Sequence, residues 1–382
     1  MILIRNARVL TMEDDQVLQG GEILIQDGKI AAVGSALSAP GARVVDAKGM
    51  YALPGVVDAH CHIGMFEDGM GFEGDDGNEA TDPLTPQLRA LDAINPMDRC
   101  FSEALSAGVT CAATGPGSAN VIGGQFLAMK TNGCDLEQMV IKEPLAMKAA
   151  FGENPKRVYS GKHQTPETRM ATAAILRGAL MDAREYLKKK QLGGDKAPEF
   201  DLKKEMLSKV LSGELLLKCH AHRADDILTA IRIAREFGLR ISLEHCTEGY
   251  LIADALKRAN VPCILGPLLS DRSKIELRNM SFKAPGILHK AGVRFALMTD
   301  HPVIPMQYLM VQAGICVREG LDEMEALRAI TLNAAWAIGL DDRLGSLKAG
   351  KDADIALYDG HPLDTRTRVK QVYVNGELAY ED

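Results

Sequence analysis

Short apolar runs alternate with stretches of helical periodicity through most of this 382-residue chain, from about Pro54 to Leu340. The segment DDILTAIRIAREFG repeats its apolar residues at the spacing of a helix, while other runs have the length of buried strands. Five such strand-like runs are GVTCAAT, ELLLKCH, LRISLEH, VPCILG and VRFALMTD. Strands and helices in this order favour a parallel sheet, and the length favours a closed barrel over an open sheet. We therefore predict an α/β fold whose (β/α)8 TIM barrel spans residues 55–343.

The two ends of the chain carry a different pattern, of short strands that alternate apolar and polar residues. Asp27-Gly28 near the N-terminus and Asn375-Gly376 near the C-terminus are both typical of tight hairpin turns. Chain ends that share one sheet must meet in space. We predict a small β-sandwich domain composed of residues 1–54 and 344–382, lying beside the barrel.

Composition and charge exclude several classes of protein. Hydrophobic residues make up 46% and charged residues 25% of the chain, which is typical of a globular protein. The net charge of −7 leaves no basic excess for nucleic acid, and no apolar run approaches the roughly 20 residues that cross a bilayer. The first residues lack the pattern of a secretory leader, so we expect a cytoplasmic protein with no membrane partner.

The eight cysteines contain no CxxC pair and are too sparse for a disulfide framework. Cys61, Cys219 and Cys246 each stand next to a candidate metal ligand, but neighbouring residues of a strand point to opposite faces. We expect these three thiols to pack in the interior, and the cysteines to be reduced.

Two segments interrupt the alternation. Residues 66–95 are acidic and rich in glycine, and they follow the first predicted barrel strand. A loop of this length is either a functional element or a solvated excursion, and the sequence leaves both readings open. Residues 161–213 are predicted to be mainly helical, with Thr165 as the cap of a long helix.

Histidines stand at the ends of the predicted barrel strands. In VVDAHCHIG, His60 and His62 are two residues apart, so both imidazoles leave the same face of a strand and can share a metal. His220, His245 and Asp300 end three later strand runs. Barrel enzymes place their active sites at this rim, so we expect the five side chains to converge. Four imidazoles and one carboxylate suit one or two divalent ions, with Zn²⁺ the first choice and Mn²⁺ or Fe²⁺ the alternatives.

This ordered set of residues resembles the H-x-H, H, H, D signature of the amidohydrolase superfamily. The segment from Thr331 to Gly360, TLNAAWAIGLDDRLGSLKAGKDADIALYDG, resembles the carboxy-terminal hallmark of that family. The likeness is nearest to the imidazolonepropionase-like branch, which also includes metal-dependent dipeptidases, and it covers nearly the whole chain. The resemblance implies a barrel with a composite sandwich, and Asp300 as a metal ligand and as general base and acid. A metal lowers the pKa of its bound water to roughly 7, and an adjacent carboxylate can pass the released proton to the leaving group.

The ligand on the fourth barrel strand is the point that the resemblance leaves open. Dinuclear members of the superfamily use a carboxylated lysine there, and several mononuclear members use a glutamate or no ligand. In EPLAMKAAFGENPKR, Lys148 is our candidate for the bridging ligand. Lys142 and Glu153 remain alternatives.

Three further residues are candidates for substrate binding. His222 follows His220 by two positions in HAHR, so it lies on the same strand face or at the start of the loop. Arg223 can hold a carboxylate in bidentate fashion, and His301 can orient the substrate or the carboxylate of Asp300. For each of these residues, a polar rim position without a ligand is the alternative.

We predict a hydrolase that acts on carbon-nitrogen bonds other than ordinary peptide bonds, in a small-molecule substrate such as a cyclic amide, an N-acyl amino acid or a dipeptide. The lack of a G-x-S-x-G motif argues against an acyl-enzyme. A ring deaminase of the same superfamily is the first alternative, but the resemblance then implies a glutamate where Arg223 stands. A non-catalytic scaffold is the second alternative, and the complete ligand set argues against it. A homo-oligomer is the default expectation for such a chain.

Overall fold

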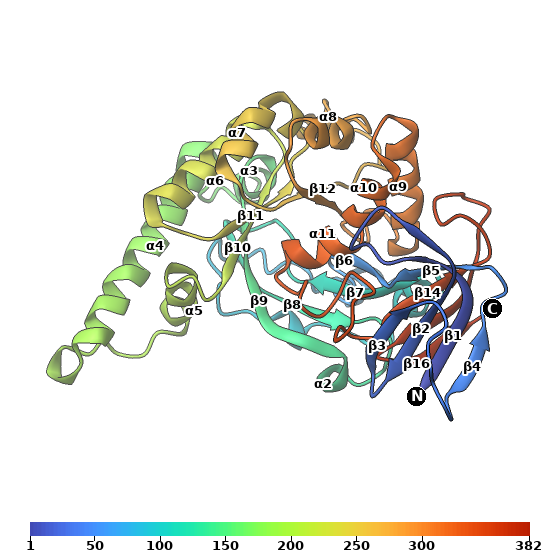
Figure 1. Ribbon diagram of the computed structural model, residues 1–382. Coiled ribbons are helices and arrows are strands. Elements are labelled where there is room, and N and C mark those ends of the chain that lie inside the picture. Colours follow the sequence, from blue (N-terminus) through green and yellow to red (C-terminus); the bar gives the residue numbers. More distant parts are fainter.

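Two separate eight-stranded sheets organise the chain (Figure 1). The computed structural model describes all residues from 1 to 382. One sheet is nearly closed into a barrel, and its spatial order, β13-β12-β11-β10-β9-β8-β7-β6, follows the chain order. Its strands are β6 (Val56–Cys61), β7 (Val109–Thr114), β8 (Ile122–Lys130), β9 (Val140–Ala150), β10 (Leu216–Ala221), β11 (Ile241–His245), β12 (Cys263–Leu265) and β13 (Phe295–Leu297).

One strand of this sheet runs against the predicted direction. β8 is antiparallel to both β7 and β9, whereas the other paired neighbours are parallel. The prediction of a wholly parallel barrel is therefore wrong at β8. A parallel neighbour needs a crossover of about a dozen or more residues, but only residues 115–121 join β7 to β8. A connection this short turns the chain straight back along the strand it has left.

The barrel closes between β13 and β6 without a ladder of strand hydrogen bonds. The buried carboxylate of Asp58 joins the two sides, because it accepts hydrogen bonds from the N–H and hydroxyl of Thr299 and from the N–H of His60. The His62 N–H also donates to the carbonyl of His301, over 2.8 Å. This seam holds the H-x-H segment against the residues that follow β13.

Helices cover the outside of the barrel (Figure 1). In α6 (Ala224–Phe237), Ile227, Ala230, Ile231 and Ala234 recur at helical spacing, and the helix packs against β10 and β11 through this buried face. The helix ends at Gly238, which adopts the left-handed conformation that glycine tolerates. The other barrel helices are α1 (Arg99–Ser106), α2 (Leu136–Met139), α3 (Glu153–Ser160), α7 (Ala253–Ala259), α8 (Ala284–Lys290), α9 (Leu309–Arg318), α10 (Glu323–Ala329) and α11 (Leu332–Ala337).

The acidic segment 66–95 is pinned to the barrel. Leu84 forms a strand-like bridge with Ile122, and Arg89 forms another with Gln125, so the segment runs along β8. It contains two short 3-10 helices, η1 (Gly71–Gly74) and η2 (Ala90–Asp92). The other 3-10 helices are η3 (Gly194–Lys196), η4 (Gly249–Ile252), η5 (Ile275–Leu277) and η6 (Met306–Tyr308).

The second insertion is mainly helical, as predicted, and its helices α4 (Arg169–Leu192) and α5 (Leu202–Leu211) project from the barrel (Figure 1). The predicted cap is wrong. The α4 helix begins at Arg169, and the hydroxyl of Thr168 accepts the hydrogen bond from the N–H of Ala171 over 3.1 Å. Thr165 precedes Pro166, and a residue before proline avoids the helical conformation.

The second sheet is built from both ends of the chain, because β5 pairs with β14. Both predicted hairpin turns form: Asp27 and Gly28, like Asn375 and Gly376, have the positive φ angles of a tight hairpin. The spatial order is β16-β15-β14-β5-β1-β2-β3, with β4 beside β1. The strands are β1 (Ile2–Leu10), β2 (Val17–Gln26), β3 (Lys29–Gly34), β4 (Arg43–Asp46), β5 (Tyr51–Pro54), β14 (Ile355–Tyr358), β15 (Val369–Val374) and β16 (Glu377–Glu381).

A buried ion cluster connects the two sheets. Lys130, at the end of β8, lies 3.0 Å from a carboxylate oxygen of Asp352 and 2.5 Å from one of Asp354. Arg343 and Lys29 also pair with Asp352. Several cations offset the cost of burying these carboxylates.

None of the helices is long and apolar enough to cross a membrane.

Candidate metal centre

The predicted ligands meet at the carboxyl ends of the barrel strands. His60 lies in β6 and His62 directly follows it, while Asp300 follows β13 across the closing seam. Asp300 Oδ1 lies 3.2 Å from His62 Nε2 and 3.6 Å from His60 Nε2. His60, His245 and Asp300 each offer a ligand atom, and these atoms lie within 4.8 Å of one another. The imidazole rings of His220 and His245 are 4.3 Å apart, so the structure brings all five predicted residues together.

Hydrogen bonds on the far side of two rings fix which nitrogen faces the centre. The Nδ1 atoms of His62 and His245 lie 2.6 Å and 2.8 Å from the backbone carbonyls of Gly115 and Gly266. A carbonyl only accepts, so each Nδ1 carries the proton and each neutral ring presents a bare Nε2 lone pair. The Nε2 of His245 is buried without a partner. This pattern is typical of metal-binding histidines.

The contact between His62 and Asp300 tests whether a metal fits. With its proton on Nδ1, a neutral His62 turns a lone pair toward the Asp300 carboxylate at 3.2 Å, and two acceptors at this distance repel. Either a second proton on His62 or a cation relieves the repulsion. Burial lowers the pKa of His60, His220 and His245 well below the usual value, so these three neighbouring rings are neutral. A neutral imidazole can offer a nitrogen lone pair to a metal. The residues therefore fit a divalent metal.

A second buried carboxylate, that of Glu244, lies beside His60. His60 Nδ1 lies 3.0 Å from Glu244 Oε2, at ion-pair distance but without the geometry of a well-directed hydrogen bond. The same oxygen lies 3.1 Å from the Nζ of Lys218, and all three side chains are buried. Burying Glu244 and Lys218 together keeps their charges paired beside His60.

Of the three candidates for the fourth-strand ligand, Lys148 alone reaches this group. It is fully buried in β9, with Nζ 3.0 Å from His60 Nε2 and 5.6 Å from the centre of the Phe126 ring. Burial lowers the pKa of Lys148 to about 8. Lys142 is exposed, and Glu153 begins α3, where its carboxylate accepts from the N–H of Glu276.

Asp300 combines an ionised carboxylate with a constrained backbone. Burial raises the pKa of Asp300, but when His62 carries its second proton, the hydrogen bond and charge of that ring and the charge of Lys148 outweigh burial and lower the pKa overall. Asp300, His245 and Cys246 all have positive φ angles, of 55°, 75° and 47°. Such conformations are uncommon for residues other than glycine and cluster at functional sites.

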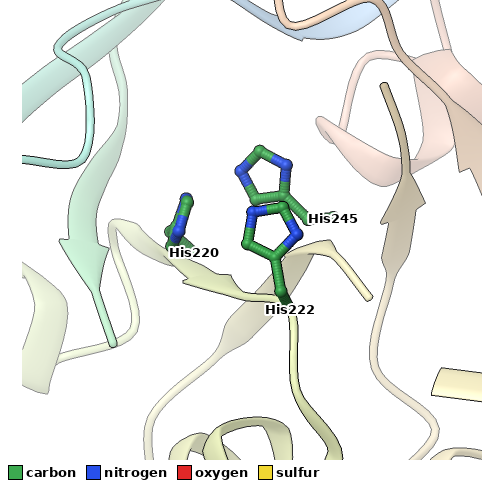
Figure 2. A group of neighbouring side chains, drawn as sticks. All are labelled: His220, His222 and His245. Carbon is green, nitrogen blue, oxygen red and sulfur yellow. The ribbon is translucent and has the colours of Figure 1, made fainter. Parts of the chain in front are cut away.

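His222 joins the histidine group, whereas Arg223 does not. Figure 2 shows the His222 ring lying over that of His245, and the two ring centres are 4.2 Å apart. His220, His222 and His245 offer ligand atoms within 4.8 Å of one another. The guanidinium of Arg223 instead pairs with Asp225, in the first turn of α6. Sequence spacing placed His222 on the strand face but carried no signal for the direction of Arg223.

His301 lines a cleft beside the metal centre. Its Nδ1 accepts from the N–H of Met306 over 3.3 Å, so Nε2 carries the proton, and this nitrogen is buried without a partner. The cleft has a volume of about 420 Å³, and Phe66, whose ring centre lies 5.8 Å from that of His62, forms part of its wall. Its acidic lining residues are Glu67, Asp68, Asp75 and Glu103. The acidic segment 66–95 thus contributes to a cavity beside the metal centre.

The cysteines stay outside the metal centre. None of the eight forms a disulfide, and Cys61, Cys219 and Cys246 are buried. Neither group of side chains that could hold a metal contains a cysteine. Burial raises the pKa of the Cys219 thiol, which further disfavours the thiolate that binds metals.

Sequence reasoning missed two buried glutamates, Glu244 and Glu276. Glu276 lies in η5, with Oε1 3.6 Å from the Nε2 atoms of both His220 and His222. The only sequence signal for Glu244 is a charged residue inside the apolar run ISLEH, and Glu276 lies in a polar segment with no such contrast. The backbone carbonyls of Gly115 and Gly266, which contact His62 and His245, could not be predicted from the sequence, because every residue has a carbonyl group.

Comparison with known proteins decides the family. Residues 51–379 match the amidohydrolase family. The chain belongs to this family. It is therefore a hydrolase of carbon-nitrogen bonds, and the resemblance to the amidohydrolase superfamily is confirmed.

Relatives and solved structures agree with this assignment. The chain is 30% identical to amidohydrolase tasK of Hapsidospora irregularis, over 100% of this chain but 43% of that protein, so it spans less than half of tasK. It is 25% identical to imidazolonepropionase of Streptococcus sanguinis (strain SK36), over 97% of this chain and 92% of that protein. The solved structure of an amidohydrolase from Thermotoga maritima MSB8 is 44% identical, with a TM-score of 0.97 and full coverage of both chains. A Xaa-Pro dipeptidase structure with bound methionine, 18% identical with a TM-score of 0.61, covers 100% of both chains and shares the fold alone.

Proposed function

We propose that this family member hydrolyses a non-endopeptidic amide bond in a small molecule: a cyclic amide, an N-acyl amino acid or a dipeptide. The observation that carries the proposal is the contact between His62 Nε2 and Asp300 Oδ1. Both atoms are acceptors, and a divalent cation bound between them would remove their repulsion. The relative named as imidazolonepropionase supports a cyclic substrate.

The ligands of the cation or cations would be His60, His62, Lys148, His220, His245 and Asp300. A nitrogen and oxygen set of this kind suits Zn²⁺, with Mn²⁺ and Fe²⁺ as alternatives. When bound, such a metal supplies activation of water and polarisation of the substrate carbonyl. The nine-tenths burial of the imidazoles would keep bulk water from competing for their lone pairs.

Asp300 would move the proton. Its side chain is 14% exposed while the His60 ring beside it is fully buried, so it is the ligand most open to a substrate. As a carboxylate of lowered pKa it can take a proton from the attacking water at Oδ and deliver it to the leaving nitrogen. The buried Nε2–H of His301, the next residue along the chain, is free to donate to a substrate oxygen.

Lys148 would act as a carbamate. Its uncharged amine would add to CO₂ to form a carbon-nitrogen bond and release a proton, leaving a negative carboxylate on Nζ. This group would supply the oxygen ligands that a lysine lacks. The position of Nζ, 3.0 Å from His60 Nε2 and out of contact with solvent, supports this assignment.

One feature supports the position of the substrate site, and another supports the cellular location. The cleft that His301 and Phe66 line has room for a small molecule and lies beside the metal centre, because the Phe66 ring contacts that of His62 and His301 directly follows Asp300. The eight free cysteines support a reducing, cytoplasmic location.

The test is a substrate screen with metal-stripped and metal-reloaded protein. Cyclic amides, N-acyl amino acids and dipeptides would be offered to the chain loaded with Zn²⁺ or Mn²⁺, and hydrolysis would be followed by release of the new amine. We expect turnover of at least one class only after reloading. Release of ammonia from a ring, with no amide cleaved, would point to the deaminase instead, and no turnover with any loaded form would refute the proposal.

A further inference from the structure

Lys274 is a cation without an anionic partner at the rim of the metal centre. It follows β12, in the connection that leads to β13, and it is partly buried. Its Nζ has one hydrogen-bond partner, the amide oxygen Oδ1 of Asn154, at 3.0 Å. The carboxylate of Glu276, two residues along the chain, faces His220 and His222 instead. No ion pair within the protein therefore neutralises the charge of Lys274.

Asn154 connects Lys274 with the metal centre. It lies in the first turn of α3 and is 8% exposed. Its amide nitrogen Nδ2 donates to the hydroxyl of Ser118 over 2.7 Å and lies 3.5 Å from the Nε2 of His220. These contacts turn the amide oxygen toward Lys274. One neutral side chain therefore separates the ammonium group from a predicted metal ligand.

The amide nitrogen of Asn154 has a donor to spare. It carries two N–H groups, and the hydroxyl of Ser118 accepts one of them. The contact with His220, at 3.5 Å, is longer than an ordinary hydrogen bond and does not satisfy the second. The ammonium of Lys274 and this amide N–H are neighbouring donors, because Lys274 binds the same amide group. Two such donors suit the two oxygens of a carboxylate.

The acidic cleft lies on the other side of the rim. Its residues His301 and Phe66 follow β13 and β6, the two strands at the closing seam. Asn154 follows β9 and His220 lies in β10, and these are the middle strands of the order from β13 to β6. No lysine or arginine lines the cleft, so its carboxylates repel a negative group. A carboxylate bound at the metal centre is therefore directed away from the seam and toward Lys274.

We propose that Lys274, together with Asn154, binds a carboxylate of the substrate and so selects amides that carry an acidic group close to the bond that is cleaved. The inference rests on the proposed function and narrows its substrate. N-acyl amino acids and dipeptides have a carboxylate on the carbon next to the amide nitrogen, and a cyclic amide fits only if it bears such a group. An uncharged amide would leave the ammonium of Lys274 without a partner, whereas a carboxylate forms a charge-assisted hydrogen bond with it.

Ligand binding tests the assignment without catalysis. The metal-stripped chain would be titrated in a calorimeter with N-acetyl-L-leucine, with L-alanyl-L-leucine and with the primary carboxamide of each. This form of the protein offers the carboxylate no metal, so a preference for the acid reports the protein's own donors. We expect the wild type to bind at least one acid about 10- to 100-fold more tightly than its amide, and Lys274→Gln to bind the two equally.

Two further variants and the kinetics of the loaded enzyme complete the test. Lys274→Arg keeps the charge and should keep the preference for the acid, and Lys283→Gln, at an exposed position of the same connection, is the matched control and should behave as the wild type. With an acidic substrate, Lys274→Gln should raise KM by the same factor and leave kcat nearly unchanged, because the carboxylate is bound equally in the ground and transition states.

The outcomes separate this proposal from the proposed function. Equal binding of acid and amide by the wild type, or a preference for the acid that survives in Lys274→Gln, would overturn the role of Lys274 even if the loaded chain hydrolyses amides. A preference that Lys274→Gln abolishes would support it, and a lack of turnover would then count against the proposed function alone.

Discussion

His62 Nε2 lies 3.2 Å from Asp300 Oδ1, and neither atom has a proton for the other when His62 is neutral. The carbonyl of Gly115 imposes this arrangement from the far side of the ring. The seam of the barrel also fixes this arrangement, because the Asp58 carboxylate accepts hydrogen bonds from the N–H of His60 on one strand and from the N–H of Thr299 after the other. The fold therefore builds a pair that is unfavourable by itself and favourable around a cation.

Replacing Asp300 separates metal binding from chemistry. Asp300→Asn keeps the shape of the side chain but cannot accept the proton, so we expect kcat to fall by about 10²- to 10⁴-fold with the fold retained. Steady-state kinetics on the substrate found in the screen, with circular dichroism and metal analysis, would measure this. Asp254→Asn, at an exposed position of α7, is the control and should keep full activity. An Asp300→Asn enzyme with wild-type kcat would remove Asp300 from the mechanism.

Carboxylation of Lys148 is directly observable. Protein reloaded with metal and ¹³C-bicarbonate should show a carbamate carbon signal by NMR, and Lys148→Ala should not. Lys142→Ala, on the exposed part of the same strand, should keep the signal. If the reloaded wild type gives no carbamate signal and takes up its full metal content in CO₂-free buffer, Lys148 is not modified.

The ion cluster between the sheets predicts a loss of stability in acid. Burial raises the pKa of Asp352, but the charge of Lys130 and hydrogen bonds from Lys29 and Lys130 outweigh it, so the folded pKa lies below the unfolded one. A depressed carboxyl pKa contributes stability above the unfolded value of about 3.9 and loses it as pH falls through the folded value. Asp352→Asn should therefore cost on the order of 2 kcal/mol at pH 7 and less as the pH falls below about 4.

Urea unfolding of the metal-free chain at several pH values would measure this difference. The control is Asp382→Asn, because Asp382 pairs with Lys370 at the surface, where solvent screens the charges. A gap between wild type and Asp352→Asn that stays constant from pH 7 to pH 3 would contradict the role of Asp352.

Local pattern was enough to predict most elements and the convergence of the candidate ligand residues at one rim. The strand runs that end in His60, His245 and Asp300 are buried because they are apolar, and parallel strands bring their carboxyl ends to one rim. The hairpin turns at Asp27-Gly28 and Asn375-Gly376 follow from the φ angles that these residues tolerate. These features depend on residues that are close together in the sequence, so apolar runs and turn residues are enough to predict them.

Contacts between distant segments decided the rest. The direction of β8 depends on a short connection, and the start of α4 at Arg169 depends on which threonine lies free of a proline. Glu276 meets His220 and His222 only because η5 folds over the ends of β10 and β11, and periodicity shows which face of a segment is buried but not which side chain meets it there. The sequence by itself determined the barrel strands and the residues at their ends, whereas the tertiary structure decided which nitrogens are bare and which carboxylates face them, because those depend on partners far along the chain.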